Sequence, residues 1–202
     1  MDFSVFRLLL LIFSLAAFPA LATPLPSGAS KMEVSGRAKP ISAATAFCDR
    51  YPVECKVDQR EPARIILDQR IWDRIEAVND EVNDKIEPVQ DIAHWGVADR
   101  WDFAEDGRGD CEDYQLLKRR LLIAEGLPRR AMRITVVIDH TGGGHAVLTL
   151  LTDRGDFILD NITRSVLAWD LTGYEFVKRE GDADRAWVGI QPPLADKVAS
   201  NH

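Results

Sequence analysis

Residues 111–160 read CEDYQLLKRRLLIAEGLPRRAMRITVVIDHTGGGHAVLTLLTDRGDFILD, and this stretch decides the fold. Its first part has the signals of a helix that begins at Cys111. Asp110 is a good N-cap, and the acidic residues of the first turn suit the positive end of the helix dipole. Gly126 and Pro128 close the element. The sequence therefore predicts a helix with marked ends.

The second part of the stretch changes to a period of two and to β-branched residues, which is typical of strands. The pattern predicts strands over 132–138, 145–152 and 157–160, joined by turns at HTGGG and DRGD, and a further strand near 186–190. Helices that precede a run of strands favour an α+β domain. We expect a helix packed on one face of an antiparallel sheet.

A second helix is predicted upstream, because apolar residues recur there at steps of three and four and form one face. Charged residues occupy the other face, and Pro88 ends the element. The apolar face consists of Leu67, Ile71, Ile75, Val78, Val82 and Ile86.

The N-terminus has the pattern of a secretory signal peptide. Arg7 precedes an apolar run, and Ala20-Leu21-Ala22 places small residues before a cleavage point. The run is about half of the roughly 20 residues that span a bilayer. We therefore expect residues 1–22 to be removed, 23–40 to form a flexible leader rich in Pro, Gly and Ser, and 41–195 to form a single domain.

The charge and hydropathy of the chain indicate which partners and which cellular compartment to expect. The formal net charge is −7 and the pI is near 5.1. Binding to phosphates depends on Lys and Arg, so this charge argues against a nucleic-acid partner. No later segment is apolar enough to cross a membrane, so we expect a periplasmic protein without stable membrane insertion after signal cleavage.

Three cysteines in an exported chain leave one unpaired. Cys48 and Cys55 flank a Tyr-Pro turn at a spacing that permits a disulfide. Cys111 is then a free thiol in an oxidising compartment, which marks it as reactive; the alternative is a small buried apolar residue. Zinc is disfavoured because no C-x-x-C or H-x-x-x-H spacing occurs.

Cys111, His145 and Asp160 have the chemistry of a nucleophilic triad. A thiol at a helix N-terminus is expected to have a lowered pKa. His145 opens a strand after three glycines, and Asp160 ends the next strand, so a hairpin brings imidazole and carboxylate together. The alternative is a core cysteine and an unrelated turn histidine.

Three short blocks around these residues resemble the bacterial transglutaminase-like cysteine proteinases. The resemblance covers roughly residues 67–177, and Cys48 and Cys55 lie outside it. The blocks are Gly109-Asp110-Cys111-Glu112-Asp113-Tyr114, His145-Ala146-Val147-Leu148 and Leu159-Asp160-Asn161.

The resemblance implies a papain-like or transglutaminase-like core with Cys111 as nucleophile, His145 as general base and Asp160 as the orienting acid. Members of that family include periplasmic calcium-dependent proteases (LapG type) that clip surface adhesins and release biofilms. The substrate implied is a protein or peptide. The resemblance also implies sequestration by an inner-membrane receptor that reads a cyclic dinucleotide.

Asp110, Glu112 and Asp113 flank a thiolate that their charges disfavour. Capping and dipole compensation explain Asp110 and Glu112 without a ligand. The resemblance implies instead a calcium ion held by these oxygens, with further ligands from other loops, since calcium takes six to eight oxygens.

Two rival functions remain open from the sequence. Acyl transfer to an amine, as in a transglutaminase, uses the same triad. A non-catalytic peptide- or receptor-binding module of the same fold is the alternative from another class, and the intact triad argues against it. Asn83 and Trp101 are candidate neighbours of the site.

Overall fold

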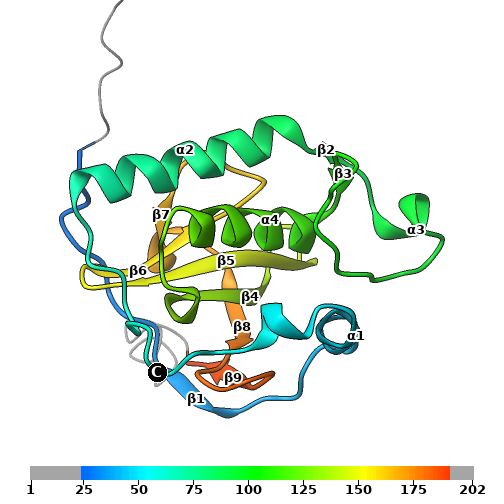
Figure 1. Cartoon of the computed structure of the whole chain (residues 1–202), viewed down its shortest axis with the longest axis horizontal. Coiled ribbons are helices and arrows are strands. Elements are labelled where there is room, and N and C mark those ends of the chain that lie inside the picture. The colour runs from blue at the N-terminus through cyan, green and yellow to red at the C-terminus, as the bar shows by residue number, and fades with distance from the viewer. Residues whose placement is uncertain (1–23, 192–202) are drawn as a thin grey trace, which may run out of the picture.

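A seven-stranded antiparallel sheet forms the centre of the computed structural model, which describes residues 24–191. The strand order is β1-β9-β8-β4-β5-β6-β7 (Figure 1). The strands are β1 Val34–Arg37, β4 Met132–Ile138, β5 Gly144–Thr152, β6 Gly155–Leu159, β7 Leu167–Ala168, β8 Glu175–Glu180 and β9 Trp187–Ile190.

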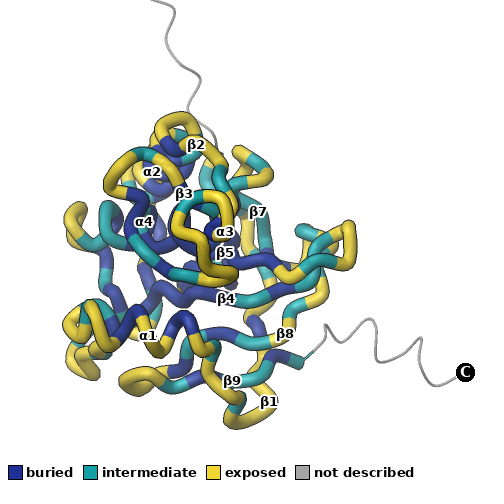
Figure 2. The backbone as a smooth tube through the Cα atoms, turned by 90° about the vertical axis from the view of Figure 1, so that its right-hand side faces the viewer, coloured by how far each residue is buried: buried dark blue, intermediate teal, exposed yellow. Residues whose placement is uncertain are grey.

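Two long helices are layered over one face of this sheet (Figure 1). α4 (Cys111–Ala124) packs on β5, and α2 (Gln69–Lys85) packs on α4. Figure 2 shows that burial concentrates in α4, β4 and β5. The other elements are α1 Ser42–Arg50, η1 Pro52–Cys55, α3 Asp91–His94, η2 Arg129–Ala131, η3 Trp169–Leu171 and the parallel pair β2 Glu87–Pro88 with β3 Arg108–Gly109.

The predicted α+β architecture is confirmed, and so are both long helices and the strands of the central hairpins. β4 has the predicted bounds, and α2 begins after Asp68, whose side chain accepts a hydrogen bond from the Ile71 amide. β8 was not predicted because its sequence, EFVKRE, is largely charged.

The predicted leader is wrong for its described part. Residues 34–37 form β1, which pairs with β9 at the sheet edge. Met32 is buried, and its amide donates a 2.9 Å hydrogen bond to Asp156. Met32 is buried just before β1, whereas the residues of β1 itself are exposed, so no apolar period marks this strand in the sequence. The predicted signal peptide at 1–22 and the end of the chain from 192 lie outside the described residues.

No helix within residues 24–191 is both long and apolar enough to span a membrane.

The predicted disulfide is present and links α1 to η1 through Cys48 and Cys55. Cys111 is the free cysteine. Closing a short loop restricts the unfolded chain, so the double substitution C48S/C55S should lower the free energy of unfolding by about 2–3 kcal/mol. Urea unfolding of both proteins measures this difference. An intact mass with three free thiols after denaturing alkylation of the native protein would contradict the pairing.

Candidate active site

Cys111 is the first residue of α4, and the N-terminus of this helix lies against the start of β5. The backbone N–H of Ala146 donates a hydrogen bond to the Cys111 sulfur. Because His145 directly precedes Ala146, the thiol and the imidazole come from the same corner of the fold. The preceding Gly109 is needed there, because a Cβ at this position would lie 2.7 Å from the Asp113 carboxylate.

His145 and Asp160 form a direct pair. β5 and β6 are antiparallel, with Leu148 opposite Leu159, so the start of β5 lies beside the residue that follows β6. His145 Nε2 lies 2.8 Å from Asp160 Oδ1, and both side chains are buried. This hydrogen bond fixes the imidazole ring and leaves Nδ1 as its second site for a proton.

Four further residues hold Asp160. The Tyr174 hydroxyl donates to Oδ2 at 2.6 Å, and the Ile162 amide donates to Oδ1 at 3.1 Å. Asn83 and Lys118 donate to the Asp160 carbonyl at 2.9 and 2.8 Å. Burial alone would raise the pKa of Asp160, but the bonds from His145 and Tyr174 lower it below its usual value. Asp160 is therefore an ionised carboxylate that these hydrogen bonds hold in one orientation.

The pKa of the Cys111 thiol is raised, contrary to the expectation from its helix position. Burial is the main cause, and the negative charges of Glu112 and Asp110 add to it. The Ala146 amide acts in the opposite direction. The Cys111 sulfur also lies 3.3 Å from a Glu112 oxygen. In the chain alone, burial and the acids beside the thiol together outweigh the Ala146 amide.

A cluster of carboxylates lies next to Cys111. The predicted Asp110, Glu112 and Asp113 do lie together, joined by Asp91 and Asp99. These residues form three overlapping groups, and within each group the side-chain oxygen or sulfur atoms that could bind a metal lie within 4.8 Å of one another. The groups are Asp110, Cys111 and Glu112; Asp91, Asp99 and Glu112; and Asp91, Asp110 and Asp113.

The cluster gathers several carboxyl groups, of which Asp91, Glu112 and Asp113 are buried and Asp99 is exposed. Burial and the neighbouring carboxylates raise the pKa of Glu112 to about 10 and that of Asp113 to about 8. Burial, followed by the charges of Asp110 and Asp99, also raises the pKa of Asp91. The raised pKa values indicate that nearby positive charges do not balance these carboxylates.

The residues fit a cation better than they fit helix capping. Asp110 is the N-cap residue of α4, as predicted, but its side chain makes no capping hydrogen bond to the helix. Its Oδ2 instead accepts from the Asp91 amide at 3.2 Å. One buried carboxylate oxygen on each of Asp91, Asp110 and Asp113 has no hydrogen-bond partner within residues 24–191. Unpaired carboxylate oxygens in a buried group are what a hard cation such as calcium requires.

Of the two candidate neighbours, Asn83 holds the Asp160 carbonyl, as described above. Trp101 is buried and hydrogen-bonds the Asp99 side chain, so it lies beside the carboxylate cluster. Sequence reasoning missed Asp91, Asp99 and Tyr174. The only signal for the two acids was one aspartate that begins the short α3 and another that follows it in the next loop, and Tyr174 gave none.

A thiol at a helix N-terminus next to a histidine–aspartate pair at a sheet end has the groups and the placement of a cysteine peptidase. The family model of the bacterial transglutaminase-like cysteine proteinases (BTLCP) matches residues 34–194. The chain belongs to this family and is a cysteine peptidase.

No curated protein matches this chain, but solved structures do, and among them are three structures of Legionella pneumophila LapG. Legionella pneumophila LapG in a calcium-bound form is 23% identical, with 71% of this chain and 78% of that chain covered and a TM-score of 0.49. The EGTA-treated form is 24% identical over 74% and 76%, with a TM-score of 0.48. A third LapG structure is 25% identical over 71% and 75%, with a TM-score of 0.47.

Proposed function

We propose that this protein is a cysteine endopeptidase that hydrolyses peptide bonds of a protein substrate through Cys111, His145 and Asp160. The observation that carries the proposal is the 2.8 Å bond between His145 and Asp160, next to the strand residue whose amide contacts the Cys111 sulfur. These two contacts support an assignment of Cys111 as nucleophile, His145 as base and Asp160 as orienting acid, the roles that acyl transfer requires.

The chemistry follows from the roles of these groups. His145 takes the thiol proton, and the Cys111 sulfur attacks the peptide carbonyl while backbone N–H groups at the start of α4 stabilise the oxyanion. The proton on His145 passes to the departing amine, which leaves an acyl group on sulfur. His145 then takes a proton from water, the hydroxide attacks the acyl carbon, and the proton returns to the sulfur as the acid is released.

Asp160 stays ionised through this cycle. It accepts from the imidazole, holds the ring orientation and stabilises the positive charge that His145 carries between the two proton transfers. Tyr174 fixes the carboxylate from its other side. Asp160 therefore acts through His145 and never touches the substrate.

We propose a calcium ion as the cofactor, held by carboxylates of Asp91, Asp99, Asp110, Glu112 and Asp113. The ion supplies positive charge beside the nucleophile, which offsets the acids that raise the pKa of the thiol. The three unpartnered buried oxygens of the cluster support this assignment.

We propose further that the protein works in the periplasm after removal of residues 1–22. A large surface adhesin as substrate, and an inner-membrane receptor as regulator, follow from the family resemblance. Fractionation of cells that make the chain with and without residues 1–22 tests the location, and mature protein in the cytoplasmic fraction only would exclude it.

Hydrolysis, acyl transfer and simple binding can be separated in one experiment. The mature protein is incubated with a mixture of unfolded proteins and a labelled primary amine, with Cys111→Ala as control. We expect new N-termini that depend on Cys111. Amine incorporation in their place would indicate a transferase, and binding with neither product would indicate a non-catalytic module.

Tyr174→Phe removes the hydroxyl that holds Asp160 and keeps the aromatic ring. The ring packs edge-on to His145 at a centroid distance of 5.8 Å. Loss of a hydrogen bond to a charged group costs about 1.5–3 kcal/mol, so we expect kcat/KM to fall by roughly 10- to 100-fold. KM should change little, because the hydroxyl supports the imidazole and not the substrate. A fall in thermal stability with unchanged kcat/KM would show a purely structural role.

Removal of divalent metal should slow alkylation of Cys111 and lower the melting temperature, because the buried carboxyl groups then lose the cation that binds them in the native state. Asp91→Asn lies outside the helix that carries Cys111 and should weaken calcium binding by at least about tenfold, which calorimetry measures. Asp106→Asn, an exposed acid outside the cluster, is the matched control. Equal calcium affinity in the wild type and Asp91→Asn would exclude Asp91 as a ligand.

A further inference from the structure

A cavity of about 290 Å³ lies on the face of the sheet that α4 does not cover. Arg133 of β4 lines it and alternates along the strand with Ile134, which packs in the core beneath the helices. Arg179 of β8 and Arg64 from the loop before α2 complete a basic lining. The apolar part of the wall includes Val34, Leu151 and Val188.

Two of these arginines are almost completely buried. Arg133 is 2% exposed and Arg179 is 8% exposed. A buried guanidinium needs hydrogen-bond acceptors for its N–H groups and a negative charge near it. Arg133 Nη1 has neither a protein partner within residues 24–191 nor contact with solvent.

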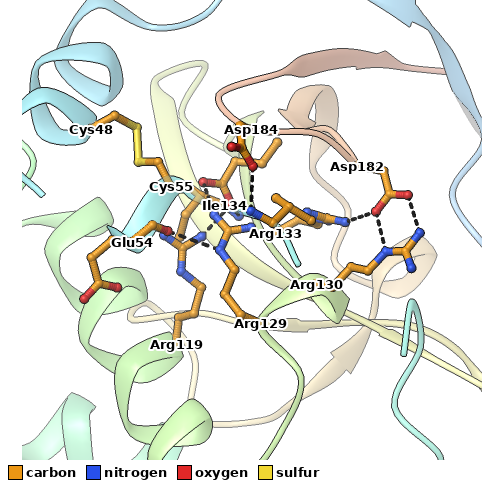
Figure 3. Close-up of polar contacts among 12 residues, drawn as sticks. Cys48, Glu54, Cys55, Arg119, Arg129, Arg130, Arg133, Ile134, Asp182 and Asp184 are labelled. Carbon is orange, nitrogen blue, oxygen red and sulfur yellow. Dashed lines mark hydrogen bonds and ion pairs between the residues drawn. A yellow bond between two sulfur atoms is a disulfide. The ribbon is translucent and has the colours of Figure 1, made fainter. Parts of the chain in front are cut away.

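The carboxylates around the cavity are already occupied. Asp182 accepts from Arg133 Nη2 at 2.7 Å, and Arg130 binds both of its oxygens, at 2.9 and 2.7 Å (Figure 3). Asp182 therefore has little capacity left for a second nitrogen of Arg133.

Asp156 is shared in the same way. It accepts from Arg64 at 2.8 Å and from the Met32 amide at 2.9 Å, and Arg179 lies 3.5 Å away. Three arginines at the cavity thus depend on two carboxylates, one of which also serves Arg130. Burial lowers the pKa of Arg133 to about 10 despite these partners.

The Glu180 carboxylate also lines the cavity and places a negative charge near Arg133, but its own hydrogen bonds go to other groups. It accepts from Arg119 at 2.5 Å, from Arg129 at 3.3 Å and from the Ile134 amide at 3.0 Å. Those partners lie toward α4 and η2, and Figure 3 shows Arg119 and Arg129 grouped apart from the Arg130–Asp182 pair. The positive charge at the cavity remains undercompensated.

We propose that this cavity binds a small oxyanion of the phosphate or carboxylate class, held by the guanidinium groups of Arg64, Arg133 and Arg179. Guanidinium groups bind oxyanions with paired, charge-assisted hydrogen bonds, which are stronger in a partly enclosed site than in water. The cavity volume accommodates such an anion with its remaining hydration. The site is separate from the thiol and needs no part of the peptidase mechanism.

The probe is inorganic phosphate, titrated calorimetrically into the full mature protein and compared with sodium chloride at equal ionic strength. We expect saturable binding with one site per chain. Acetate in a parallel titration separates a carboxylate preference from a phosphate preference. Absence of saturable heat with both anions would overturn the proposal, because it would show that the cavity binds neither of them.

Substitution of the cavity arginines tests whether phosphate binds in this cavity. Arg179→Gln should weaken phosphate binding at least tenfold, and Arg64→Gln, at the more exposed rim, tests the same cavity if the first variant does not fold. Arg37→Gln, an exposed arginine of β1, is the matched control and should bind as the wild type does. Phosphate binding that is unchanged in Arg64→Gln and in folded Arg179→Gln would place the anion elsewhere and contradict the assignment.

Discussion

His145→Ala should lower the second-order rate of Cys111 alkylation by a peptide electrophile by about 10³-fold or more. The thiol pKa is raised by burial and by Glu112, so without a base the thiolate fraction near neutral pH is very small. Removing one member of a nucleophile–base pair costs nearly as much as removing both. Stopped-flow or mass-spectrometric labelling at saturating calcium measures the rate.

His140→Ala is the control for this result. His140 packs on Tyr174 at a centroid distance of 5.1 Å but has no hydrogen bond to Asp160 among the described residues. We expect less than a tenfold change in the labelling rate. Equal losses in the two variants would mean that the aromatic packing near Asp160 matters and that His145 is not the base.

Glu180→Gln is expected to have the largest effect on stability, with a loss of about 3–5 kcal/mol in the free energy of unfolding. Glu180 is the carboxylate shared by Arg119 and Arg129, which are 1% and 9% exposed. Burial would raise its pKa, yet the arginines lower it. Without this charge, two buried guanidinium groups lose their counter-ion.

Chemical unfolding measures this loss, and Glu175→Gln is the matched control at the exposed start of the same strand. The control should change stability by less than about 0.5 kcal/mol. A loss below about 1 kcal/mol in Glu180→Gln would show that water compensates the arginines and that the buried cluster is not a stabilising centre of the fold.

The local parts of the fold could be predicted from sequence because their signals are local. In α2, α4 and β4 the apolar residues recur at a regular spacing, and residues typical of element ends lie at the boundaries. β8 lacks such a signal, because Arg179 and Glu180 read as surface residues. Both are paired with residues far along the chain, Arg179 with Asp156 and Glu180 with Arg119. Sequence reasoning cannot find a buried charge whose partner is supplied by another element.

The same limit applies to the candidate site. Cys111, His145 and Asp160 were found because helix and hairpin signals place them. Asp91 was missed because the parallel pairing of β2 with β3, which sets Pro88 opposite Gly109, brings it beside Asp110. That pairing involves two residues in each strand and has no sequence signal.

The most direct test of the central claim is to find which side chain carries the acyl group. The native mature protein is trapped with a peptide electrophile at saturating calcium, digested and sequenced by mass spectrometry. We expect one adduct, on Cys111, that is lost in His145→Ala and in Cys111→Ala. An adduct on another residue, or labelling of Cys111 at the rate of an ordinary free thiol and unaffected by His145→Ala, would contradict it.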